Sequence, residues 1–306
     1  MQNRYVLEPG MRLFIVLMRD LCRLNKIMES KMNYEKQAVH DFWNKESCGE
    51  IYFSELEKDQ YAELNRKEYE HQAKIRYELE PYILDFADFQ NYKQKKVLEI
   101  GVGLGADHQK FAEVGAELTG VDLTPRAINY TRKRLEICGL QSNVEVADAE
   151  NLPFDNESFE LVYSWGVLHH SPDTKKCISE VFRVLKTGGK AKVMIYHTYS
   201  FNGYFLWVRY GLLKGKPRTS LAEIYDKHQE SPGTKAYSIK EARDMFKQFE
   251  NVEIKTVLTH GDLFTARRMT NGHPILYRVL KVLWPRRIIK TFFKSHGFFM
   301  LIEATK

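Results

Sequence analysis

The chain has 306 residues, of which 43% are hydrophobic and 28% charged, and its formal net charge is +6. This length exceeds that of a usual single domain, so we expect one α/β core with appended segments or two small domains, and the composition argues against extensive disorder. The positive charge is local, because residues 267–294 carry eight Arg or Lys and no Asp or Glu. A uniformly basic nucleic-acid-binding protein does not have this distribution, so no nucleic-acid partner is predicted.

The cysteines and the apolar runs bear on the compartment of the protein. The four cysteines occur singly, without the close pairs of a zinc site or a redox motif, so reduced thiols and no metal site are predicted. The apolar run at residues 13–18 is too short for a membrane span or a signal sequence. We therefore expect a cytoplasmic protein, with Met1 and Met32 as alternative translation starts.

Residues 1–90 are expected to form an N-terminal helical extension and lid. Apolar residues at positions 13, 16, 17, 21 and 24 have the spacing of one stripe of a basic amphipathic helix. The stretch 38–89 is rich in Glu, Lys and Tyr and predicts further helices. Pro81 is expected in the first turn of the last of these helices.

Residues 91–200 alternate between strand, glycine turn and helix, which predicts parallel strands joined by right-handed helical crossovers. The final third, residues 201–306, is expected to hold an acceptor-site insert, a basic amphipathic segment and the last strands of the sheet. A helix is predicted there at residues 239–249. The predicted strands of the whole chain are 97–100, 117–121, 144–146, 159–163, 191–196, 252–257 and 298–303.

A glycine turn follows the first predicted strand. Residues 97–100 lead into Gly101, Gly103 and Gly105, and a helix is expected to begin near Ala106. Glycines let the backbone approach a nucleotide closely, but the same pattern also fits the dinucleotide fingerprint of a dehydrogenase. The turn by itself therefore predicts nucleotide binding without selecting the nucleotide.

Two carboxylates follow the next two predicted strands. Asp122 comes 17 residues after Gly105 and can accept hydrogen bonds from both hydroxyls of a ribose. It is not needed as a helix cap, because Thr124 and Pro125 already supply the cap and first turn of the next helix. Asp148 ends the third strand, where it is a suitable acceptor for an adenine amino group. This second carboxylate favours S-adenosylmethionine over NAD.

With these residues the chain resembles the class I S-adenosylmethionine-dependent methyltransferases, in particular the group that includes quinone and small-molecule methyltransferases. The resemblance covers residues 97–197 strongly and the flanks weakly. It implies a Rossmann-like, doubly wound, mostly parallel seven-stranded sheet with an antiparallel last strand at residues 297–303. The motifs that carry it are Val97–Gly105, Gly120–Pro125, Asp148–Phe154, Tyr163–His170 and Arg183–Gly189, the last with Lys186-Thr187 in place of the commoner Lys-Pro.

The resemblance also implies where the cofactor binds. Glu99 and the glycine turn would hold the methionyl part of S-adenosylmethionine, and Asp122 would hold its ribose. Asp148 and the amide of Ala149 would read the adenine edge, and Leu123 would pack on the ring. Together with the residues beside the sulfonium, the implied cofactor site is Glu99, Gly101, Gly103, Gly105, Asp122, Leu123, Asp148, Ala149, Ser164 and Trp165.

Methyl transfer is an in-line displacement, so the main task of the protein is to hold the acceptor behind the methyl group. A hydroxyl acceptor would also need a general base, and a histidine at the carboxyl edge of the sheet is the natural candidate. His169 and His170 follow the fourth strand, and His197 follows the fifth. A purely structural hydrogen-bonding role remains the alternative for each of them.

Aromatic residues predict an apolar acceptor. Tyr196 and Tyr199 are expected to line the pocket, and the aromatic insert at residues 201–210 lies where such folds build acceptor sites. Residues 42–44 and the pair at 76–77 are expected to belong to the lid, although aromatic residues at helical spacing also serve a core. The predicted acceptor is a small or lipidic, non-protein molecule. An NAD-dependent dehydrogenase and a catalytically silent nucleotide-binding protein remain the alternatives.

The basic segment 267–294 predicts contact with an anionic membrane surface or with a lipid-linked acceptor. Pro285 is expected to break its helix before Arg286 and Arg287. The alternative is that its apolar residues pack on the sheet while the charges face water. The apolar residues interleaved with Arg278 and Lys281 are Ile275, Leu276, Val279, Leu280, Val282, Leu283 and Trp284.

Overall fold

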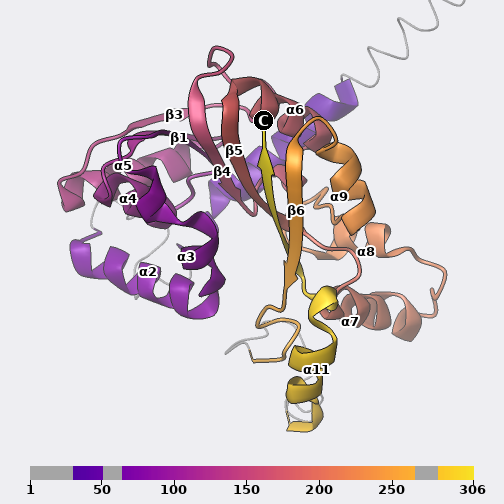
Figure 1. Cartoon of the computed structure of the whole chain (residues 1–306). Helices are drawn as coiled ribbons and strands as arrows, with labels where there is room; N and C mark the ends of the chain where they lie inside the picture. The colour runs from indigo at the N-terminus through magenta and orange to yellow at the C-terminus, as the bar shows by residue number, and fades with distance from the viewer. Residues whose placement is uncertain (1–29, 51–63, 266–281) are drawn as a thin grey trace, which may run out of the picture.

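The computed structural model describes residues 30–50, 64–265 and 282–306. Its centre is a seven-stranded sheet in the order β3-β2-β1-β4-β5-β7-β6 (Figure 1). The strand β7 is antiparallel to both of its neighbours, β5 and β6, while the other described strand pairs are parallel. The expected Rossmann-like sheet with an antiparallel last strand is therefore confirmed.

All seven predicted strands are present. The fifth strand begins at Leu185 rather than at Ala191. Its pairing with the fourth strand jumps from Phe159↔Leu185 to Leu161↔Lys190, so the residues around Gly188 and Gly189 form an irregular part of the strand. The strands are β1 (Lys96–Ile100), β2 (Glu117–Asp122), β3 (Asn143–Val146), β4 (Phe159–Trp165), β5 (Leu185–Tyr196), β6 (Glu250–Val257) and β7 (Phe299–Thr305).

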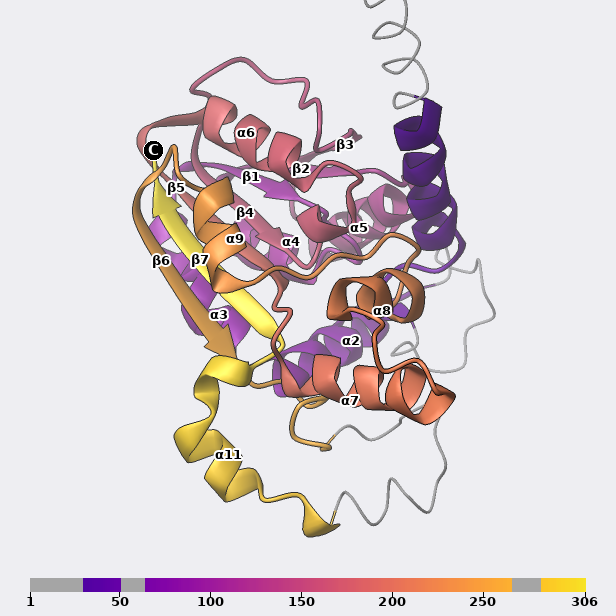
Figure 2. The same cartoon turned by 90° about the vertical axis from the view of Figure 1, so that its right-hand side faces the viewer.

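Helices cover both faces of the sheet (Figures 1 and 2). Residues 30–45 are helical as well. The short 3₁₀ helices are η3 (Phe89–Tyr92), η4 (Leu168–His170), η5 (Leu212–Lys214) and η6 (Lys294–His296). The labelled α-helices are α2 (Arg66–Leu79), α3 (Tyr82–Ala87), α4 (Ala106–Glu113), α5 (Pro125–Cys138), α6 (Thr174–Val184), α7 (Phe201–Tyr210), α8 (Leu221–His228), α9 (Ile239–Met245) and α11 (Arg286–Phe292).

Alternation along the strands divides the core between the two faces. Leu98 and Ile100 of β1 pack in a buried cluster with α6 and α9, whereas Val97 packs in a second cluster with α3, η3 and α4. Successive side chains of a strand point to opposite faces, so both faces of this central strand must be apolar. Burial on both sides fixes the register of β1 and hence the position of the glycine turn that follows it.

Local caps fix the helices that follow the strands. Thr124 caps α5 through its side chain, with Pro125 in the first turn, as predicted. Pro81 is the cap residue of α3 and lies directly before its first turn. The predicted helix at 239–249 ends at Met245 and begins with a capping box formed by Ser238 and Glu241.

The C-terminal helix α11 projects away from the sheet in both views (Figures 1 and 2). Pro285 separates it from the helical residues 282–283, as the sequence predicted. The other apolar residues of the predicted segment, Ile275, Leu276, Val279 and Leu280, lie outside the described residues, as does the apolar stripe near the N-terminus. No described helix is both long and apolar enough to cross a membrane.

Candidate active site

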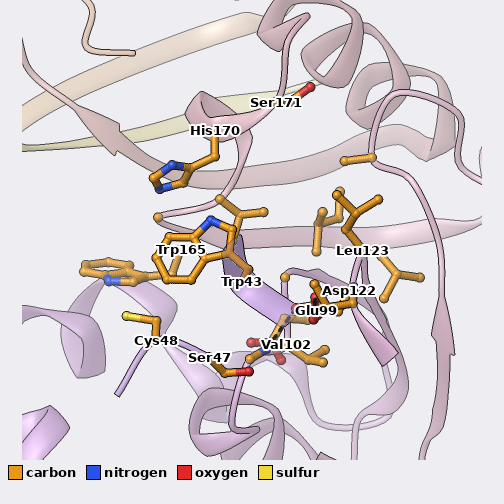
Figure 3. A pocket seen from close by; sticks show the side chains of 18 of the residues that line it. Trp43, Ser47, Cys48, Glu99, Val102, Asp122, Leu123, Trp165, His170 and Ser171 are labelled. Atoms are coloured by element: carbon orange, nitrogen blue, oxygen red, sulfur yellow. Dashed lines mark hydrogen bonds between the residues drawn. The ribbon is translucent and has the colours of Figure 1, made fainter. Parts of the chain in front are cut away.

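A cavity of about 240 Å³ lies at the carboxyl ends of the parallel strands (Figure 3). It spans the point between β1 and β4 where the strand order reverses, which is the usual ligand site of doubly wound sheets. Figure 3 shows Trp165, Cys48 and His170 toward one end and Leu123 and Asp122 toward the other, with Trp43 between them. We call these the acceptor end and the cofactor end of the cavity, and we count Trp43, which packs against His170, with the acceptor end.

The glycine turn forms part of the wall at the cofactor end. Gly101 has φ +84°, and a Cβ atom there would lie 2.1 Å from Val167. Gly103 has φ +52°, and a Cβ atom there would meet no protein atom within 4 Å. The turn therefore leaves an open cradle along its backbone at Gly103, as close approach of a ligand requires. Gly105, predicted for the same site, caps α4 and does not line the cavity.

Asp122 ends β2 and lines the cavity together with Leu123. One carboxylate oxygen accepts the Gly103 amide at 3.2 Å, and the other accepts the amide and the hydroxyl of Thr124, each at 2.9 Å. Burial raises the pKa of this carboxyl group. The three donors hold the carboxylate in one orientation toward the cavity, where its remaining lone pairs can accept ribose hydroxyls.

Glu99 on β1 lines the cavity and shares a proton with His108 of α4. The Ser142 hydroxyl donates to the Leu118 carbonyl oxygen at 2.7 Å, so its oxygen accepts from His108 Nε2 at 2.8 Å. In neutral His108 this leaves a lone pair on Nδ1, which lies 2.8 Å from Glu99 Oε2. A proton must therefore lie between these two atoms. Burial raises the pKa of Glu99 and lowers that of His108 to about 3, which favours the proton on Glu99.

Helix α2 brings a buried ion pair to the cavity. Arg76 donates to Asp107 through Nη2 at 2.7 Å and through Nε at 3.2 Å. Tyr77 and Tyr163 add hydroxyl donors at 3.0 and 2.9 Å. Burial acts to raise the pKa of Asp107, but the Arg76 charge and these hydrogen bonds outweigh it and lower the pKa. Asp107 is therefore a fully partnered anion that anchors the predicted lid residues 76–77 to α4.

Glu80 follows α2 at the acceptor end and was not predicted from the sequence. Its Oε2 atom accepts from Trp165 Nε1 at 3.1 Å and lies 3.5 Å from Arg76 Nη1. Burial raises the pKa of Glu80 to about 7. Glu80 immediately precedes the helix-opening Pro81, and nothing in that local pattern indicates a side chain turned toward a cavity.

The helix at residues 30–45 closes the cofactor end. Lys36 Nζ lies 2.6 Å from Asp148 Oδ2 and 2.7 Å from Glu150 Oε2, and Asp148 Oδ1 accepts the Glu150 amide at 2.9 Å. Asp148 and Ala149 line the cavity, as expected for residues at an adenine edge. Lys36 was not predicted, because it lies in a charged stretch and is 112 residues from Asp148 in sequence. Trp43 of the same helix packs edge-on against His170, with ring centroids 5.3 Å apart.

Of the three candidate base histidines, the structure brings only His170 to the cavity lining. His169 is fully buried and packs on Tyr196, with ring centroids 3.9 Å apart. His197 Nδ1 donates to the Gly297 carbonyl oxygen at 3.1 Å, away from the lining. His170 Nδ1 lies 2.8 Å from Ser231 Oγ, and burial lowers the pKa of this imidazole to about 3.

Tyr196 and Glu230 form a polar pair at the acceptor end. The Tyr196 hydroxyl donates to Glu230 Oε2 at 2.7 Å, and His170 Nε2 lies 3.6 Å from the same oxygen. Glu230 lies in the loop that follows α8 and has φ +47°, which is uncommon for a residue other than glycine. Phe299 of β7 stacks on Tyr196 at 5.7 Å and completes an aromatic wall with Trp43 and Trp165.

Several other predicted pocket residues lie away from the lining. The Ser164 hydroxyl donates to the Ile100 carbonyl oxygen at 2.9 Å, while its neighbour Trp165 does line the cavity. Tyr199 is 52% exposed and, like the whole of α7, is absent from the lining. Helix α7 is instead held by its cap Ser200, which contacts the Tyr225 hydroxyl, and by Asp262, which accepts the Asn202 amide at 3.0 Å.

Comparison with known proteins identifies the segment that carries the glycine turn and both carboxylates. Residues 98–193 match the family described as "Methyltransferase domain". A phthiotriol/phenolphthiotriol dimycocerosates methyltransferase of Mycobacterium leprae is 42% identical over 101 residues, which are 32% of this chain and 37% of that protein. A sterol 4-C-methyltransferase of Caenorhabditis elegans is 31% identical over 109 residues, 35% of this chain and 32% of that protein. The chain thus matches about a third of the length of these relatives.

Among solved structures, phosphoethanolamine N-methyltransferase 2 of Haemonchus contortus, in complex with phosphomonomethylethanolamine and S-adenosylhomocysteine, is similar with a TM-score of 0.49. The sequence identity is 19%, and the alignment covers 74% of this chain and 52% of that one. A methyltransferase of Haloferax volcanii, solved with its Trm112 activator, also aligns with a TM-score of 0.49, at 17% identity over 79% of this chain and 97% of that one.

Proposed function

We propose that this chain, whose residues 98–193 form a class I S-adenosylmethionine-dependent methyltransferase domain, methylates a small, apolar or lipidic, non-protein acceptor. The observation that carries the proposal is the cavity at the strand ends, where the glycine cradle, Asp122 and Asp148 meet an aromatic acceptor end. S-adenosylmethionine is the cofactor of this domain. The match of residues 98–193 also removes the support for a dehydrogenase.

The described residues fit the cofactor. The open cradle at Gly103 leaves room for a ligand against the backbone, and the oriented Asp122 carboxylate would hold the ribose. Asp148 and the Ala149 amide would hold the adenine edge, with Lys36 fixing the carboxylate from the opposite side. Glu99 would face the methionyl ammonium, and the proton between Glu99 and His108 would move to His108 Nδ1 to leave a carboxylate there. These groups would position S-adenosylmethionine at the cofactor end of the cavity.

The acceptor must lie in line behind the transferred methyl group, and the walls of the cavity decide where it can lie. When bound, S-adenosylmethionine supplies a methyl group already activated by a positive sulfur. Trp43, Trp165 and Phe299 present aromatic surface at the acceptor end and would exclude water from an apolar acceptor. The similarity to a phthiotriol/phenolphthiotriol dimycocerosates methyltransferase and to a sterol 4-C-methyltransferase supports a lipidic acceptor in this chain.

Two measurements test the proposal. Isothermal titration should give binding of S-adenosylhomocysteine and no binding of NAD. Incubation with methyl-labelled S-adenosylmethionine and separate metabolite and lipid extracts should give a labelled small product, identified by mass spectrometry. Binding of S-adenosylhomocysteine without any labelled product would instead support a catalytically silent nucleotide-binding protein. Binding of NAD alone would overturn the proposed function.

A further inference from the structure

The acceptor end of the cavity contains a carboxylate that the cofactor does not need. Glu230 lines the cavity beside His170, whose Nε2 atom lies 3.6 Å from Glu230 Oε2, whereas Asp122 lies toward the cofactor end (Figure 3). Its side chain is 36% exposed, in contrast to that of His170, which is 6% exposed. A ligand entering the acceptor end can therefore reach this carboxylate.

Glu230 is held so that one oxygen stays available. Oε2 accepts the Tyr196 hydroxyl at 2.7 Å and faces His170 Nε2 at 3.6 Å. Within residues 30–50, 64–265 and 282–306, no hydrogen-bond donor contacts Oε1. The positive φ of Glu230 keeps its backbone in a sparsely populated conformation, which commonly persists at functional sites. The loop thus delivers a carboxylate with a fixed orientation and a free acceptor atom.

The charges around the cavity restrict the acceptor further. Its lining contains two cations, and both are already paired, Lys36 with Asp148 and Glu150, and Arg76 with Asp107 and Glu80. The lining also contains six carboxyl groups, in Glu80, Glu99, Asp107, Asp122, Asp148 and Glu230, and burial raises the pKa of Glu80 and Glu99 toward the protonated form. An acceptor carrying a phosphate or carboxylate near its reacting atom would meet repulsion there without a free cation to offset it.

We propose that Glu230 accepts a hydrogen bond, and then the proton, from the reacting group of the methyl acceptor. The acceptor therefore reacts through a hydroxyl or an amine rather than through an anionic group. This inference rests on the proposed methyl transfer. A lone pair of the acceptor oxygen or nitrogen forms the new bond to the methyl carbon, and the carbon–sulfur bond breaks with its electrons going to sulfur. The O–H or N–H proton passes to Glu230 Oε1 and then to solvent. Tyr196 is a positioning residue that orients the carboxylate.

The titratable groups that face Glu230 come from several elements. Tyr196 lies on β5 and His170 in η4, and Glu80 and Cys48 also line this end of the cavity. His170 is the competing base, because its Nε2 atom has no hydrogen-bond partner among the described residues. The test must therefore separate Glu230 from His170.

The experiment uses the full chain, methyl-labelled S-adenosylmethionine and the metabolite and lipid extracts described above. Glu230→Gln should lower the labelling rate about 100-fold or more while S-adenosylhomocysteine affinity is unchanged, because the amide keeps the shape but accepts no proton. Glu230→Asp should retain part of the rate. Tyr196→Phe should lower kcat by a smaller factor and leave the KM for S-adenosylmethionine unchanged. Glu223→Gln, on the exposed surface of α8, is the matched control and should label like the wild type.

The outcomes distinguish the proposed role of Glu230 from the proposed methyl transfer itself. Equal labelling by wild type and Glu230→Gln would overturn the inference while leaving methyl transfer intact, and loss of labelling in His170→Gln alone would assign the proton to His170. Mass spectrometry of the product should place the methyl group on an oxygen or nitrogen that carried hydrogen. A methyl ester or a new carbon–carbon bond would also overturn the inference. If the wild type labels nothing in either extract, the proposed function fails, and this inference fails with it.

A second surface supports an independent proposal. Val282 and Leu283, directly before Pro285, are 81% and 73% exposed, and Ile288 and Phe292 on one face of α11 are 54% and 76% exposed. Arg287, Lys290 and Lys294 are exposed beside them, and residues 282–302 contain no Asp or Glu. Ile289, the residue next to Ile288 on α11, is buried. The exposed side chains of residues 282–294 therefore form an apolar, basic outer face of this segment.

We propose that this outer face of α11 docks on an anionic lipid surface. Apolar side chains would enter the interface while the basic side chains meet the lipid headgroups, which is the usual arrangement of an amphipathic surface helix. Its charge is complementary to anionic lipid and not to a zwitterionic surface. The helix is anchored to the protein through Arg286 Nε, which donates to the Leu263 carbonyl oxygen at 2.8 Å, and through Trp284 Nε1, which donates to the Asp262 carbonyl oxygen at 3.0 Å.

Co-sedimentation of the full chain with phosphatidylglycerol-containing vesicles and with pure phosphatidylcholine vesicles tests this docking. Binding is expected to the anionic vesicles only and to weaken as salt is raised. Arg287→Gln and Lys290→Gln should each weaken binding about fivefold, and Ile288→Ser with Phe292→Ser should abolish it. Lys93→Gln and Leu84→Ser, exposed elsewhere, are the controls. Absence of binding to anionic vesicles at low salt, or equal binding by the α11 variants, would overturn the proposal.

Discussion

The two ends of the cavity are built from the sequence in different ways. The cofactor end is formed by residues that directly follow consecutive parallel strands, with Gly101 after β1, Asp122 at the end of β2 and Asp148 after β3. The acceptor end combines residues from distant segments, among them Trp43, Glu80, Tyr196, Glu230 and Phe299. The sheet topology alone assembles the first end, whereas the second depends on how the lid and the later loops pack against the sheet.

Helix α2 carries Arg76, which forms the buried ion pair with Asp107. Loss of this ion pair gives the largest expected effect on stability. Arg76→Met should lower the free energy of unfolding by about 3 to 5 kcal/mol, because it leaves the buried Asp107 carboxylate without its cation. Chemical denaturation of the variant measures this loss. Lys74→Met on the same helix, where the ion pair with Glu78 is exposed, should change stability little.

A double variant shows whether the loss arises from the stranded charge. Adding Asp107→Asn to Arg76→Met should recover part of the stability, because the amide is cheaper to bury unpaired than the carboxylate. If the double variant were as unstable as the sum of the two single variants, the ion pair would not explain the attachment of α2.

At the cofactor end, Asp122→Ala should weaken S-adenosylhomocysteine binding by about 1.5 to 3 kcal/mol, because two ribose hydroxyls lose a charged acceptor. Isothermal titration measures the change. Asp155→Ala, in a loop that does not line the cavity, is the matched control and should bind like the wild type. Unchanged affinity in a folded Asp122→Ala protein would remove Asp122 from the cofactor site. The assignment of this end of the cavity to the cofactor would then fail.

The sequence predicted the sheet, and which residues follow its strands at the cavity, for a physical reason. Strand alternation and glycine turns are local patterns, and in a parallel sheet the residue after each strand must fall at the same edge. Neither Lys36 nor Glu230 could be found in this way, because their roles arise from contacts with Asp148 and Tyr196, which are far away in the sequence. The three histidines were equivalent in sequence, and only packing around Tyr196 separates His170 from His169.

The acceptor end should also respond to pH through Glu80. Burial raises the pKa of Glu80 from 4.5 to about 7, so the folded state favours its protonated form. The stabilising contribution of this group is therefore complete below pH 4.5 and is lost as the pH rises through about 7. Between pH 5 and 8 the wild type should lose up to about 2 kcal/mol of stability relative to Glu80→Gln, a value reduced because the side chain is partly exposed.

Denaturation of both proteins at several pH values measures this difference. Glu78→Gln, exposed near the end of the same helix, serves as the control and should follow the wild type across the range. A constant difference between wild type and Glu80→Gln from pH 5 to pH 8 would show that Glu80 stays ionised in the fold, and the acceptor end would then carry one more negative charge.

The smallest expected effect separates cofactor contact from backbone strain at the glycine turn. Gly103 and Gly139 have φ of +52° and +67°, and a Cβ atom at either position meets no protein atom within 4 Å. Alanine at each should therefore cost a similar free energy of unfolding, about 1 kcal/mol, because both adopt the left-handed conformation. Only Gly103 lines the cavity, while Gly139 caps the far end of α5. Gly103→Ala should thus weaken S-adenosylhomocysteine binding at least tenfold while Gly139→Ala binds normally, and equal affinities would show that the cofactor does not approach this backbone.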